Sequence, residues 1–210
     1  MIILSHRGYW KINSEKNCTP SFDRSFSLGF GTETDVRDYK GKLVISHDIA
    51  DEKSIPVEDF FKIYKKYSQS FPLALNIKSD GLQNKLKELI KKYNLTNYFV
   101  FDMSVPDGLR YLDQRIKVFT RQSEYESIPS FYNESCGVWI DEFQGHWIDI
   151  ETIKKHIKNN KKICIVSPEL HKREHIQEWK NYKEIEMELG ISDIMICTDY
   201  PEEAKEFFNE

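Results

Sequence analysis

Short apolar runs that alternate with longer amphipathic stretches constrain the fold of this chain most. Eight runs rich in apolar or β-branched residues predict strands, at 2–4, 32–36, 73–77, 98–101, 116–120, 137–140, 163–166 and 194–198. Apolar residues recur at helical spacing over 82–93 and 148–157, and lysines occupy the opposite face of the first of these segments. This alternation is typical of a parallel α/β sheet.

The remaining segments complete the pattern. Residues 104–113 and 127–135 predict short helices, and the turn at 38–42 predicts a hairpin with a further strand at 43–45. Eight strands in 210 residues leave about 26 residues for each strand–helix unit, which suits a small (β/α)8 TIM barrel formed as one domain over 1–210. A doubly wound open sheet is the alternative, although the chain contains neither a G-x-G-x-x-G turn nor a P-loop.

Composition and charge exclude several classes of protein. Hydrophobic residues make up 40% of the chain and its net charge is -4, so we expect a folded, soluble domain rather than a disordered one. The acidic balance argues against nucleic acid or a membrane surface as a partner. The first residues lack a secretory apolar region, and the four cysteines form no C-x-x-C pair. We therefore expect a cytoplasmic protein with reduced cysteines.

Polar residues stand where the predicted strands end, which is where a (β/α)8 barrel builds its active site. Two of them, Glu33 and Asp35, are two positions apart on one strand, so their side chains point to the same face with Cα atoms roughly 6 to 7 Å apart. Two buried carboxylates repel each other unless a cation compensates them. A divalent cation, Mg²⁺ or Ca²⁺, is one solution, and a buried ion network with Arg7 and Lys78 is the other.

Two histidines, His6 and His47, follow different strands. A pair of imidazoles beside a metal-bound phosphate can serve as general acid and general base, because each titrates near neutral pH. Arg7 is suited to bidentate contact with the phosphate, and Lys78 is suited to act as a point charge. The alternative is that each histidine is a hydrogen-bonded structural residue.

Four short blocks of sequence match a known family in their order along the chain. His6-Arg7-Gly8, 33–37 (ETDVR), 43–48 (LVISHD) and 196–201 (ICTDYP) resemble the glycerophosphodiester phosphodiesterase family in order and spacing. The resemblance spans nearly the whole chain, and Asn17 is similar to the asparagine near the family's first helix. It implies a (β/α)8 barrel, a divalent cation, and hydrolysis of a phosphodiester with His6 and His47 as acid and base.

Carried over by position, the resemblance also implies that Glu33 and Asp35 bind the metal and Arg7 the phosphate. The third strand departs from the family, because Asn76-Ile77-Lys78 stands where a Glu-x-Lys is usual. An amide oxygen can bind Mg²⁺ or Ca²⁺ but brings no charge, so we expect weaker cation binding through Asn76.

The resemblance predicts an enzyme that hydrolyses a small soluble phosphodiester to an alcohol and a phosphomonoester. Its partner is then the small-molecule substrate, with no nucleic acid and no membrane. Two alternatives stay open: a catalytically impaired barrel that binds a phosphorylated ligand, and a phosphodiesterase for nucleotide-linked or lipid diesters. The segment 171–175 (HKREH) matches an inverted zinc-protease motif but lacks a recognisable third ligand, so we expect no zinc site there.

Overall fold

The computed structural model describes residues 1–67 and 69–209. Contacts divide the chain into two compact units. The N-terminal unit comprises Ser5–Val118, and the C-terminal unit comprises Met1–Leu4 together with the chain from Phe119 onward. Strand β1 (Ile2–His6) begins in the C-terminal unit, where the Ile2 amide donates to the Ile194 carbonyl at 2.8 Å, and ends in the N-terminal unit.

In the N-terminal unit, β2 (Gly31–Tyr39) lies parallel to β5 (Leu73–Ile77), and β5 lies parallel to β6 (Tyr98–Phe101). Strand β2 also forms an antiparallel hairpin with β3 (Lys42–Ile45), which pairs with the short β4 (Ile55–Pro56). The helical elements of this unit are η1 (Asn13–Glu15), α1 (Thr19–Ser27), α2 (Val57–Tyr64), α3 (Gln83–Lys92) and α4 (Val105–Asp113).

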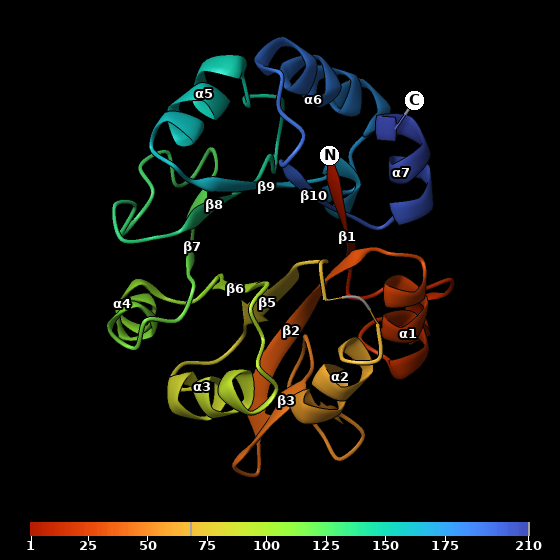
Figure 1. Cartoon of the computed structure of the whole chain (residues 1–210), viewed down its shortest axis with the longest axis vertical. Helices are drawn as coiled ribbons and strands as arrows, with labels where there is room; N and C mark the ends of the chain where they lie inside the picture. The colour runs from red at the N-terminus through yellow and green to blue at the C-terminus, as the bar shows by residue number, and fades with distance from the viewer. Residues whose placement is uncertain (68, 210) are drawn as a thin grey trace. The chain divides into compact units, whose positions relative to one another are not determined.

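In the C-terminal unit, four strands lie parallel in the order β7, β8, β9, β10. Their bounds are Phe119–Gln122, Gly137–Ile140, Lys162–Val166 and Met195–Thr198. The helical elements are α5 (Ile150–Lys158), η2 (Pro168–His171), α6 (Ile176–Leu189) and α7 (Pro201–Asn209), and α5, α6 and α7 lie on one face of these strands (Figure 1).

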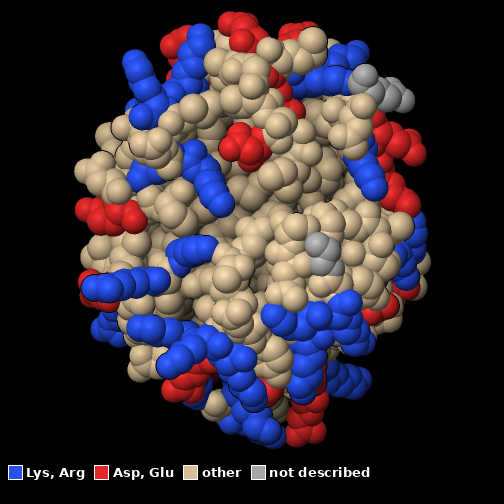
Figure 2. All heavy atoms as spheres, viewed as in Figure 1, with Lys and Arg blue, Asp and Glu red and all other residues tan. Residues whose placement is uncertain are grey.

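Amphipathic helices cover the strands because one side of each is apolar. Leu86 and Ile90 of α3 are buried, whereas the lysines of the same helix are exposed. Lys and Arg accordingly gather at the bottom of the view in Figure 2, where Figure 1 places α2, α3 and the β2–β3 hairpin. Between α1 and α2, the buried rings of Phe22 and Phe60 pack edge to face with centroids 4.6 Å apart.

Most of the predicted elements are confirmed. The strands at 73–77, 98–101 and 137–140 are found with their predicted bounds, and the hairpin after β2 is present. The strand predicted at 116–120 instead spans Phe119–Gln122. The helix predicted at 127–135 is wrong: this segment forms turns, and Phe131 has φ 42°, which an α-helix does not allow. None of the helices built by the described residues combines the length and apolarity needed to cross a bilayer.

Candidate functional site

All seven predicted site residues belong to the N-terminal unit, and β1, β2, β5 and the loop after β3 carry them. His6 is the last residue of β1, and Arg7 stands in the tight turn that follows, where Arg7 has φ 58° and Gly8 has φ 79°. A Cβ on Gly8 would lie 2.5 Å from Ser21 Oγ, so the turn needs glycine. The turn directs the Arg7 backbone amide to Glu33 Oε2 at 3.1 Å.

Asp35 is the best-connected carboxylate of the site, and its side chain is 1% exposed. Arg7 Nε lies 3.2 Å from Asp35 Oδ2, and Lys78 Nζ lies 3.4 Å from Asp35 Oδ1. Asn17 Nδ2 donates to Asp35 Oδ2 at 2.8 Å, while Asn17 Oδ1 accepts a hydrogen bond from the Thr34 hydroxyl at 2.8 Å, which fixes the amide orientation. The ion network with Arg7 and Lys78 therefore exists around Asp35.

Glu33 lies beside Asp35 on the same face of β2 and is 2% exposed. Burial and, next, the carboxylate of Asp35 raise the pKa of Glu33 to about 7, although His6, Lys78 and Arg7 oppose the rise. This raised pKa favours the protonated, uncharged form of the carboxyl group more than in water. A cation bound there would compete with that proton and relieve the repulsion between the two carboxylates.

Asn76 completes this face of the sheet, because the strand register places it directly opposite Asp35. Its Oδ1 is buried and has no hydrogen-bond partner among the described residues, and such an atom is costly to leave unpaired. Two carboxylates and an unpartnered amide oxygen are the kind of donors that Mg²⁺ and Ca²⁺ prefer. Glu33, Asp35 and Asn76 therefore fit a hard divalent cation.

The two histidines differ in their surroundings. His6 ends β1, is half-buried, and accepts a hydrogen bond from Trp10 Nε1 on its backbone oxygen at 3.1 Å. The side chain of His47 is 44% exposed on the loop after β3, and its Nδ1 lies 2.9 Å from Asp48 Oδ1. That hydrogen bond is the main cause of a lowered pKa at Asp48. A carboxylate on Nδ1 directs the other ring nitrogen, Nε2, away from Asp48.

The sequence analysis missed Asp102, which directly follows β6 and has φ 72°. Its Oδ2 lies 3.4 Å from Lys78 Nζ, so Lys78 bridges Asp102 and Asp35. The signal was available, because Asp102 is the polar residue that ends the strand predicted at 98–101. Asn17, which donates to Asp35, was noted in the sequence only for its similarity to a family asparagine and was not predicted as a site residue.

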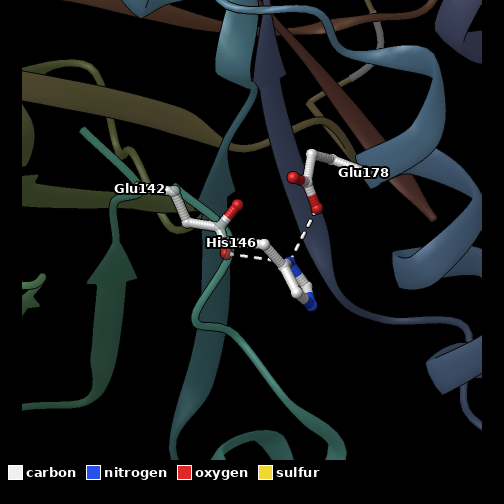
Figure 3. Close-up of side chains that lie close together, drawn as sticks. All are labelled: Glu142, His146 and Glu178. Atoms are coloured by element: carbon white, nitrogen blue, oxygen red, sulfur yellow. Dashed lines mark ion pairs between the residues drawn. The ribbon is translucent and has the colours of Figure 1, made fainter. Parts of the chain in front are cut away.

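A second group of acidic and histidine side chains, Glu142, His146 and Glu178, lies in the C-terminal unit (Figure 3). His146 Nδ1 lies 2.7 Å from Glu178 Oε2 and 3.3 Å from Glu142 Oε1. Glu142 is fully buried, and it accepts hydrogen bonds from the Trp147 amide at 2.9 Å and from the Tyr182 hydroxyl at 2.6 Å. These bonds already occupy both carboxylate oxygens, so Glu142 ties the loop after β8 to α6.

The two histidines of the segment 171–175 have different carboxylate neighbours. His171 Nε2 lies 2.5 Å from Asp141 Oδ1, whereas His175 Nε2 lies 3.5 Å from Glu203 Oε1. The two imidazoles thus pair with different carboxylates.

Comparison with known proteins supports the fold. No sequence model of a protein family matches the chain, and no curated protein sequence matches it. Among solved structures, the chain is similar to a proposed glycerophosphodiester phosphodiesterase from Galdieria sulphuraria, with 18% identity, a TM-score of 0.79, and coverage of 100% of this chain and 98% of the other.

Two further solved structures share the fold. A glycerophosphoryl diester phosphodiesterase from Parabacteroides distasonis matches with 14% identity and a TM-score of 0.71, over 99% of this chain and 86% of the other. A Ca²⁺-dependent phosphatidylinositol-specific phospholipase C from Streptomyces antibioticus matches with 9% identity and a TM-score of 0.57, over 99% and 95%. With the observed alternation of strands and helices, these matches confirm the predicted α/β, (β/α)8 TIM-barrel class.

Proposed function

We propose that the chain is a metal-dependent phosphodiesterase of the glycerophosphodiester phosphodiesterase type, and that residues 1–210 act as one barrel domain. One observation carries the proposal: two buried carboxylates of β2 and an unpartnered amide oxygen of the neighbouring strand β5 share one face of the sheet, beside Arg7 and Lys78. The fold shared with several phosphodiester-cleaving enzymes supports the same reaction class.

In this proposal Glu33, Asp35 and Asn76 hold the cation, which is Mg²⁺ or Ca²⁺. When bound, the cation supplies charge stabilisation to a phosphodiester, which is commonly the largest catalytic contribution. Arg7 and Lys78 contact the phosphate oxygens. Both side chains lie within 3.4 Å of Asp35, beside the proposed cation ligands, and so are placed to reach a phosphate bound there.

The proposed acid and base are His6 and His47. One imidazole takes a proton from the attacking oxygen, either of water or of a neighbouring substrate hydroxyl, while the other gives a proton to the leaving oxygen. Asp48 supports His47 in either role, because its carboxylate accepts a hydrogen bond from the Nδ1–H and stabilises the charged ring.

We propose that the substrate is a small soluble diester and that the protein acts in the cytoplasm without a nucleic-acid or membrane partner. A lipid-derived or nucleotide-linked diester is the second candidate, and the structural match to a phosphatidylinositol-specific phospholipase C favours its lipid form. A catalytically impaired barrel that binds a phosphorylated ligand is the third. Two features favour this third candidate: Asn76 carries no charge, and Asp35 already pairs with Arg7 and Lys78.

A panel of phosphodiesters separates these candidates. Purified protein is incubated with glycerophosphodiesters, inositol phospholipids and nucleotide diesters, with Mg²⁺, Ca²⁺ or a chelator, and released phosphomonoester is measured. We expect release from a glycerophosphodiester that depends on the cation. Release from only the inositol lipid would select the second candidate, and tight binding of phosphorylated compounds without release would select the third.

A further inference from the structure

The position of Lys78 raises a question for cation binding. Its ammonium lies 3.4 Å from Asp35 Oδ1 and 3.4 Å from Asp102 Oδ2, and its side chain is only 19% exposed. A divalent cation at Asp35 would compete with this ammonium for the carboxylate, and an ammonium that lost Asp35 would lose one of its two carboxylate partners in a largely buried place. The free energy needed to leave the Lys78 ammonium without a carboxylate would weaken cation binding, unless a second carboxylate stays paired with it.

Asp102 is placed to keep it. The backbone of Lys78 is held in place, because its amide donates to the Val36 carbonyl at 2.9 Å and its carbonyl accepts from Arg37 Nη2 at 3.1 Å. Only the end of the Lys78 side chain is then free to turn from Asp35 toward Asp102. The left-handed backbone of Asp102, with φ 72°, brings this carboxylate to the lysine from the neighbouring strand β6.

We infer that Asp102 is a positioning residue: its carboxylate stays paired with the Lys78 ammonium when a divalent cation binds Asp35. The inference rests on the proposed function. It also gives a reason why the site works with an uncharged Asn76: the acidic group missing from β5 is found at the end of β6, where it binds the lysine rather than the cation.

A double-mutant cycle on the full chain tests this role. Calorimetric titrations with Mg²⁺ alone and with Ca²⁺ alone compare the unmodified protein with Asp102→Asn, Lys78→Met and the double variant. Asparagine tolerates positive φ as aspartate does, and Asp102→Gly removes the same charge at a backbone that glycine also accepts. Asp80→Asn is the matched control, since Asp80 is exposed on the loop just after Lys78.

We expect Asp102→Asn to weaken cation binding about fivefold in the unmodified background and less than about twofold in the Lys78→Met background. Asp80→Asn should leave the affinity unchanged. Thermal unfolding confirms that each variant is folded, and Asp102→Gly replaces Asp102→Asn if the latter is not.

Four outcomes would overturn the inference. An equal loss in both backgrounds would mean that Asp102 acts on the cation directly, and an equal loss in Asp80→Asn would mean that any nearby charge has the same effect. A protein that binds the cation and hydrolyses a diester, yet is indifferent to Asp102→Asn, would overturn this inference and leave the proposed function standing. An unmodified protein that binds neither cation would overturn both.

Discussion

Replacement of Glu33 by glutamine should stabilise the metal-free protein at alkaline pH. Glu33 is buried, and burial together with Asp35 raises its pKa from 4.5 to about 7. Glutamine has almost the same shape and can still accept the hydrogen bond from the Arg7 amide. The substitution therefore removes a buried charge without removing the contact.

The sign and size follow from proton linkage. Because the folded-state pKa of Glu33 is raised, this group contributes most stability below its unfolded value of 4.5 and loses that contribution as pH rises through about 7. Each pKa unit corresponds to about 1.4 kcal/mol, so the unmodified protein should lose about 2 to 3 kcal/mol relative to Glu33→Gln between about pH 5 and pH 8.

Urea unfolding of both proteins across this pH range, with a chelator present, measures the difference. Other titrating groups are common to both proteins and cancel. Glu52→Gln is the control, because Glu52 is 79% exposed and should shift the curve by less than about 0.5 kcal/mol at any pH. Parallel curves for the unmodified protein and Glu33→Gln would refute the assigned burial and charge of Glu33.

Three further substitutions test the site and its supports. Asn76→Asp adds a carboxylate at an atom without a hydrogen-bond partner and should tighten Mg²⁺ or Ca²⁺ binding about tenfold by calorimetry; unchanged affinity would exclude this side chain as a ligand. Asn17→Ala removes the donor to Asp35 and should lower the free energy of unfolding by about 1–2 kcal/mol in urea; a smaller loss would show that this bond is dispensable. Gly8→Ala places a Cβ 2.5 Å from Ser21 Oγ at φ 79° and should cost about 1–3 kcal/mol; an unchanged unfolding midpoint would contradict the described turn.

The sequence predicted the regular parts of the fold well because apolar runs bounded by polar residues mark buried strands. It placed the start of β7 too early because Ile116 and Val118 are buried like strand residues, although Val118 forms only an isolated parallel bridge to Val100 before the strand begins at Phe119. The helix at 127–135 failed because the positive φ of Phe131 is a backbone property that side-chain periodicity does not encode.

The candidate site was predictable where its functional residues lie near one another in the sequence. Glu33 and Asp35 share a strand, and strand alternation alone puts them on one face. Asp102 was not found because its contact with Lys78 depends on two neighbouring strands and a left-handed residue. The raised pKa of Glu33 likewise depends on how deeply β2 is covered, which one sequence does not specify.

We propose that the site carried by β1, β2, β5 and the loop after β3 hydrolyses a phosphodiester with His6 and His47 as acid and base. The direct measurement is the turnover of folded His6→Ala and His47→Ala, each saturated with the divalent cation, on the diester that the unmodified protein cleaves best. We expect each variant to lose about 10²- to 10⁴-fold in kcat while it still binds the cation. Turnover equal to that of the unmodified protein in both variants would contradict this proposal.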